Sequence, residues 1–85
     1  MKKFDLILLT VFNEHKVINI SGALSVSQLL DLLPQDEKRK SYSTVYRHLQ
    51  TLQRIGYIQC GLVDALASTW YLTGLGQRIY ETHYK

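Results

Sequence analysis

The 85-residue chain has few cysteines, prolines and glycines and no long apolar run, and these shortages exclude several classes of protein. It has one cysteine, Cys60, so no internal disulfide can form and nothing requires an oxidising compartment. One proline and five glycines are too few for a linker-rich or collagen-like chain. The apolar run Leu6–Phe12 is far below the roughly 18 residues of a membrane span, and no small-residue cleavage site follows it. We expect a cytoplasmic protein without a membrane partner.

The sequence also lacks the patterns that carry catalysis. It has no glycine-rich phosphate loop, no Ser/His/Asp or Cys/His pairing and no converging carboxylates, so we expect no enzyme. The histidines His15, His48 and His83 are scattered, and no Cys/His spacing fits a zinc site. We therefore expect no metal and no cofactor, and we interpret Cys60 as a buried structural thiol.

What is present is typical of one folded domain spanning residues 1–85, with 46% hydrophobic and 20% charged residues. An amphipathic helix is predicted over Lys3–His15, with an apolar stripe of Phe4, Ile7, Leu8, Val11 and Phe12. The β-branched stretch Val17–Ile20 predicts a brief strand. Ser25 and Gln28 form a capping box for a second helix, which Pro34 ends. Gln35–Lys40 is interpreted as a connection whose start holds a further helical turn.

The third helix is the best-marked element and is predicted over Ser43–Ile55. Ser41 or Ser43 caps it, and Gly56 follows at the position where a helix commonly ends with a residue in the left-handed conformation. Its apolar positions are Val45, Leu49, Leu52 and Ile55.

A hairpin and a last helix complete the chain. Ile58, Cys60 and Leu62 alternate with more polar residues or glycine, and Thr69–Thr73 returns after a turn over Asp64–Ser68. The last helix opens at Thr73 or the next residue, and its apolar stripe contains Leu75, Ile79, Tyr80, His83 and Tyr84. The predicted order is helix, strand, helix, helix, strand, strand, helix.

Three stretches in this order resemble the winged helix-turn-helix superfamily. Leu24–Leu30 is similar to the start of a positioning helix, and Ser43–Ile58 to a recognition helix entering a wing. Tyr71–Gly76 resembles the exit from the wing into a closing helix. The Thr-Val-Tyr-Arg core at residues 44–47 is similar to the DNA-binding half of ferric-uptake regulators, and Leu-Thr-x-x-Gly to phenolic-acid-type and multidrug-type repressors. The implied fold is α+β, mostly helical, with a short antiparallel wing.

Charge is distributed unevenly along the chain. The net charge is +3, but the segment from Lys38 to Arg54 has five basic residues and no Asp or Glu, which leaves −2 for the rest. A basic segment on a mildly acidic body indicates an anionic partner, with nucleic acid first. The alternative is a solvated surface that happens to be basic.

We predict that ten residues of this segment contact DNA. Arg47 is suited to bidentate pairing with guanine and Gln50 to adenine. Ser43 and Thr44 would donate to phosphate, and Tyr46 would either meet DNA or pack against the second helix. The full set is Lys38, Arg39, Lys40, Tyr42, Ser43, Thr44, Tyr46, Arg47, Gln50 and Arg54.

The function expected from this resemblance is that of a sequence-specific double-stranded DNA-binding transcriptional regulator, a small stand-alone repressor without an effector domain. It would act as a homodimer through the first and last helices, unless their apolar stripes are used in the monomer core. The candidate interface residues are Phe4, Phe12, Ile79, Tyr80 and Tyr84.

The alternative is a winged helix that binds protein, as an antirepressor, an inhibitor or an assembly adaptor. The wing favours this alternative, because Leu62, Val63 and Leu66 are apolar and Asp64 is the only charged residue there. RNA binding ranks third, because no aromatic-rich sheet face is present.

Overall fold

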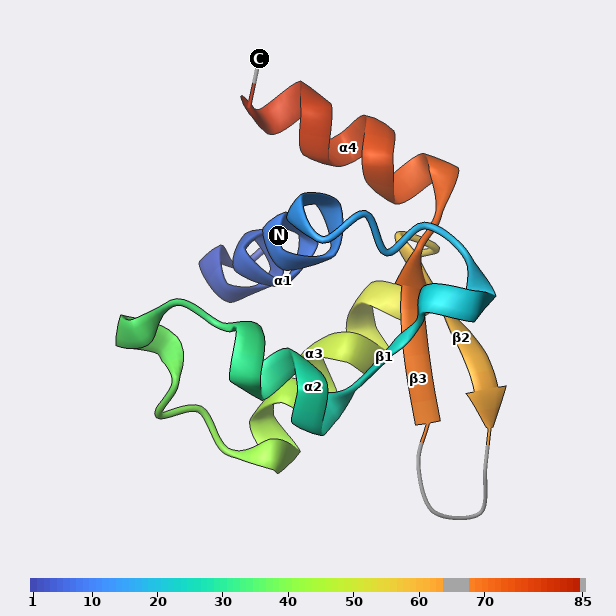
Figure 1. The fold of residues 1–85 in the computed structure, drawn as a ribbon. Coiled ribbons are helices and arrows are strands. Elements are labelled where there is room, and N and C mark those ends of the chain that lie inside the picture. The colour runs from blue at the N-terminus through green and yellow to red at the C-terminus, as the bar shows by residue number, and fades with distance from the viewer. Residues whose placement is uncertain (64–67, 85) are drawn as a thin grey trace.

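The computed structural model describes residues 1–63 and 68–84. Its architecture is a winged helix of the α+β class, as predicted (Figure 1). The α-helices, short 3-10 helices (η) and strands occur in this order: α1 (Lys3–Glu14), η1 (Ile20–Gly22), β1 (Leu24–Ser25), α2 (Val26–Leu32), η2 (Gln35–Glu37), α3 (Tyr42–Arg54), β2 (Ile58–Val63), β3 (Ser68–Leu72) and α4 (Gly74–Tyr84).

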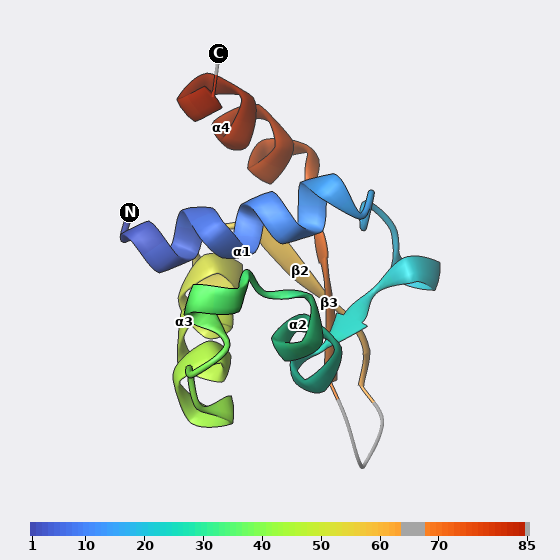
Figure 2. The same ribbon diagram turned by 60° about the vertical axis from the view of Figure 1, so that its left-hand side comes forward.

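The sheet has three antiparallel strands in the order β1-β3-β2. β1 pairs with β3 through Leu24 opposite Trp70, and β2 pairs with β3 through Ile58 opposite Leu72. The helices α2 and α3 lie beside the sheet, α1 crosses them, and α4 packs on the outer side of α1 (Figures 1 and 2). The N-terminal end of α3 therefore points away from α1 and α4 (Figure 2).

One apolar core lies between these layers. Trp70 and Phe12 are its largest fully buried side chains, and α3 contributes Val45, Leu49 and Leu52. Phe4 and Phe12 are 6% and 0% exposed, so neither can form a dimer interface. That part of the predicted interface is wrong, because the stripe of α1 is used inside the monomer.

The predicted strand Val17–Ile20 is also wrong in position. Val17 is buried and its carbonyl accepts from the Leu72 N–H at 2.8 Å, but the chain then turns into η1. Asn19 caps that turn by accepting from the Gly22 N–H at 3.2 Å. The strand forms at Leu24–Ser25, where the two residues pair with Trp70 and Thr69 of β3.

The start of α2 matches its prediction closely. The Ser25 hydroxyl accepts from the Gln28 N–H at 3.2 Å, and the Gln28 side chain accepts from the Ser25 N–H at 2.9 Å. This reciprocal pair is the predicted capping box, and it stabilises the turn from β1 into the helix.

The ends of α3 differ slightly from the prediction. Ser41, not Ser43, is the N-cap, and its hydroxyl accepts from the Thr44 N–H at 3.2 Å. Ile55 lies beyond the helix with 47% of its surface exposed, so it does not belong to the apolar stripe. Leu75, predicted to join the stripe of the last helix, is 43% exposed.

Residues 64–67 of the predicted turn lie outside the described residues, as does the side chain of Tyr84. The apolar wing tip therefore remains a prediction. Cys60 is half-buried and packs against the core, so its thiol is less enclosed than predicted.

A corner between α3, β2 and α4 fixes the hairpin relative to α3. Gly56 has φ +90°, the left-handed conformation predicted for it. The Thr73 hydroxyl lies 2.7 Å from the Gly56 carbonyl and accepts from the Gly76 N–H at 3.0 Å. One side chain thus links the end of α3 to the start of α4.

Candidate nucleic-acid interface

The helix α3 presents a different kind of surface in each direction, because residues three and four apart share a face. Its buried row is Val45, Leu49 and Leu52. The three remaining rows face solvent, the sheet and the N-terminal end of α1, and each contains residues predicted to bind DNA.

The row that faces solvent consists of Ser43, Arg47, Gln50 and Arg54, all exposed. Their spacing of four, three and four residues places them on one line along the helix. Within the described residues, no carboxylate lies within 4.0 Å of Arg47 or Arg54. The helix itself has no Asp or Glu, so this row offers cations, a hydroxyl and an amide without an internal acidic partner.

The row that faces the sheet is aromatic. The Tyr42 and Tyr46 rings stack with centroids 6.5 Å apart, and Tyr46 meets the buried Trp70 edge-on at 5.8 Å. Farther along, the Gln53 side chain accepts from the Trp70 indole N–H at 3.0 Å. Tyr46 is half-buried against β3, whereas Tyr42 is 54% exposed and remains accessible.

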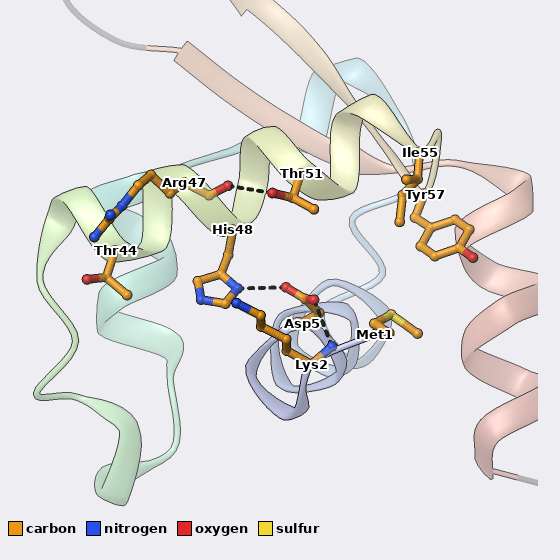
Figure 3. A pocket seen from close by; sticks show the side chains of 9 residues that line it. All are labelled: Met1, Lys2, Asp5, Thr44, Arg47, His48, Thr51, Ile55 and Tyr57. Carbon is orange, nitrogen blue, oxygen red and sulfur yellow. Dashed lines mark hydrogen bonds and ion pairs between the residues drawn. The ribbon is translucent and has the colours of Figure 1, made fainter.

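The third row lines a hollow of about 620 Å³ between α3 and the start of α1 (Figure 3). Its central contact joins His48 Nδ1 to Asp5 Oδ1 at 2.7 Å. The second Asp5 oxygen accepts from the Lys2 backbone N–H at 3.0 Å, and Phe4 meets the His48 ring edge-on. The lining residues are Met1, Lys2, Asp5, Thr44, Arg47, His48, Thr51, Ile55 and Tyr57.

The loop before α3 carries the other predicted cations, and all three are exposed. Lys40 is held from two directions, because Glu37 lies 4.0 Å away and the Phe4 ring centroid lies 5.1 Å from its ammonium. In the described part of the chain, Lys38 and Arg39 have no carboxylate at ion-pair distance. These two are therefore the available cations of the loop.

The structure thus brings the predicted residues together on and around α3, but they lie on different faces of the helix. Four share the solvent-facing row, Tyr42 and Tyr46 flank it on the sheet side, and Thr44 flanks it on the α1 side. Sequence reasoning missed Lys2 and Asp5 as neighbours of this surface. No local signal could have found the Asp5–His48 contact, because the two residues are 43 positions apart.

Two other kinds of site have no counterpart in residues 1–63 and 68–84. No helix there has the length and apolar character needed to cross a bilayer. The same residues contain no group of three His, Cys, Asp or Glu side chains that could hold a metal ion.

Comparison with known proteins defines the fold. No family model and no curated protein matches the sequence. Among solved structures, TubR from Bacillus megaterium pBM400 superimposes with a TM-score of 0.76 at 20% identity, over 92% of this chain and 80% of that one. AF1382 from Archaeoglobus fulgidus superimposes with a TM-score of 0.70 at 19% identity, over 99% and 84%. At these identities the likeness is one of fold.

Proposed function

We propose that the protein is a sequence-specific regulator that binds double-stranded DNA by inserting α3 into the major groove. The observation that carries this proposal is the row Ser43, Arg47, Gln50 and Arg54, which is exposed on a helix without acidic residues. Duplex DNA combines dense negative charge with base edges that donate and accept hydrogen bonds. The row offers chemistry complementary to both.

The position of each residue along α3 suggests its role. In helix-turn-helix docking, the N-terminal part of the recognition helix meets base edges and later residues meet the backbone. Arg47 and Gln50 would then contact bases, and a bidentate Arg–guanine pair is worth about 1–3 kcal/mol of discrimination. Arg54, together with Lys38 and Arg39, would contact phosphates, which positions the protein without specifying a sequence.

We further propose that the protein binds a two-fold site as a homodimer and acts as a repressor in the cytoplasm. One α3 reads only a few base pairs, so a pair of half-sites is needed for a selective target. Because Phe4 and Phe12 are buried, we place the dimer contact on α4, where Leu75 is exposed and Ile79 and Tyr80 are half-buried. A dimer on a promoter would exclude polymerase without needing an effector domain.

The test is selection of bound sequences from a pool of random duplex DNA, followed by affinity measurements on the enriched site. Arg47→Ala is the test variant, and Lys3→Ala is its control, because Lys3 is exposed on α1 and its substitution removes the same charge. We expect an enriched palindrome, with affinity and base preference lost in Arg47→Ala and retained in Lys3→Ala.

Other outcomes assign the function differently. A steep loss of affinity with salt and no enriched motif would mean backbone contacts alone, and an architectural role. No binding at low salt would refute the DNA proposal and favour the protein-binding alternative. Sedimentation of the free protein and of its DNA complex tests the dimer, which a one-to-one complex on the enriched site would contradict.

A further inference from the structure

The hollow between α1 and α3 has features of an anion-binding site. Most of its lining residues do not belong to the solvent-facing row of α3. It is lined by two cations, Lys2 and Arg47, and by one carboxylate, Asp5. Figure 3 shows the Lys2 side chain extending from α1 toward His48, and the Arg47 side chain extending toward Thr44. Two segments far apart in the sequence thus supply positive charge to one open depression.

The single carboxylate of the hollow is occupied by donors of the protein itself. Asp5 is 5% exposed, and both of its oxygens are engaged, one with His48 Nδ1 and the other with the Lys2 backbone N–H. Neither oxygen is therefore free to take up Lys2 Nζ or Arg47 as an ion-pair partner. The ammonium of Lys2 has no ion-pair partner among the described residues.

A hydroxyl at the edge of the hollow is also available to donate. Thr44 Oγ1 accepts from the Ser41 hydroxyl at 2.9 Å, so its own hydrogen remains free for a ligand. Thr51 differs, because its hydroxyl already donates to the Arg47 carbonyl at 3.1 Å. Lys2, Arg47 and Thr44 are therefore three of the donors that line the hollow.

We propose that this hollow binds a backbone phosphate of the DNA strand beside α3, with Lys2 as its principal cation. The proposal rests on the proposed function, which it extends from α3 to the first residues of the chain. Arg47 belongs both to the solvent-facing row and to the lining of the hollow. When α3 lies in the major groove of DNA, the strand that flanks the groove therefore comes close to Lys2. The Asp5–His48 contact acts as a positioning pair, because it ties the start of α1 to α3.

The test is the salt dependence of affinity for the enriched DNA site, compared between Lys2→Ala and Lys3→Ala. The two lysines are adjacent and exposed, and they carry the same charge, but only Lys2 lines the hollow. The Lys2 backbone N–H that binds Asp5 is retained in the alanine variant, so α1 keeps its cap. Thermal unfolding of each variant verifies this.

We expect Lys2→Ala to reduce the slope of log affinity against log salt by about 0.9 for each lost phosphate contact, which is about 1.8 for the homodimer on its two half-sites. The preferred sequence stays the same, and Lys2→Arg retains the wild-type slope. Lys3→Ala also leaves the slope unchanged. Neutral methylphosphonates placed singly along the site would then locate the phosphate, because one position in each half-site weakens binding of the wild type but not of Lys2→Ala.

Equal slopes for all variants, or equal losses from Lys2→Ala and Lys3→Ala, would overturn the phosphate site. Either result would leave the proposed function intact, provided that Arg47→Ala still alters the motif. Absence of DNA binding by the wild-type protein would refute both proposals together.

Discussion

Removal of the Asp5 carboxylate is the perturbation that most directly tests how α1 is held against α3. Asp5 is the buried charged residue of the described chain, and it accepts from two groups, the His48 ring and the Lys2 backbone N–H. Asp5→Ala removes both acceptors at once. It leaves His48 without its partner and the first turn of α1 without its cap.

The expected magnitude follows from these two contacts. The 2.7 Å separation is typical of a charge-assisted hydrogen bond, which contributes about 1.5–3 kcal/mol. Loss of the cap costs about 1 kcal/mol. The free energy of unfolding should therefore fall by about 3 kcal/mol, which lowers Tm by about 12–24 °C in a domain of this size.

The assay is urea denaturation of Asp5→Ala, His48→Ala and the double variant, with Asp31→Ala as the control. Asp31 is exposed on α2, so its loss changes the net charge equally and should alter stability by under about 0.5 kcal/mol. The double-mutant cycle isolates the contact, and we expect a coupling energy of about 2 kcal/mol. A coupling energy below about 0.5 kcal/mol would refute the argument that this pair fixes α1 on α3.

Two further predictions use neighbouring residues of the same type. Gly76→Ala should cost about 3 kcal/mol or more in urea denaturation, because its Cβ would lie 2.0 Å from the Tyr57 carbonyl oxygen, whereas Gly74→Ala has open space and should be neutral or stabilising. Gln53→Ala should cost about 1–2 kcal/mol by leaving the Trp70 indole N–H unpaired, with little change in the selected DNA motif. Gln50→Ala should do the reverse, altering the motif at one position without changing stability; equal effects of Gln50→Ala and Gln53→Ala on either measurement would contradict the assignment of the two faces.

Local patterns in the sequence predicted much of the fold because their physical causes act within a few residues. The Ser25/Gln28 capping box, the left-handed Gly56 and the buried row of α3 are all decided inside one helical turn or one helix. The strand predicted at Val17–Ile20 failed because strand pairing depends on a distant partner. β3 pairs with Leu24 and Ser25 across 46 and 44 positions of sequence, respectively.

The candidate site divides in the same way. Helical spacing and the local excess of Lys and Arg indicated the surface of α3, since both are properties of a continuous segment. The sequence could not predict that Gln50 would face solvent while Gln53 binds a core residue. The contact that orients Gln53 comes from Trp70, which lies on another element. The aromatic character of Tyr46 likewise gave no sign of whether the ring would face solvent, the second helix or β3.

That α3 is an amphipathic, basic helix follows from the sequence, because capping, periodicity and charge depend on residues close together in the chain. Which side chains of α1 enter the core and which lie beside α3 depends on how the helices pack together. Burying Phe4 and Phe12 orients α1 so that Asp5 reaches His48 and Lys2 reaches the edge of the candidate interface. Such a contact depends on the packing of whole helices, which no short stretch of sequence specifies.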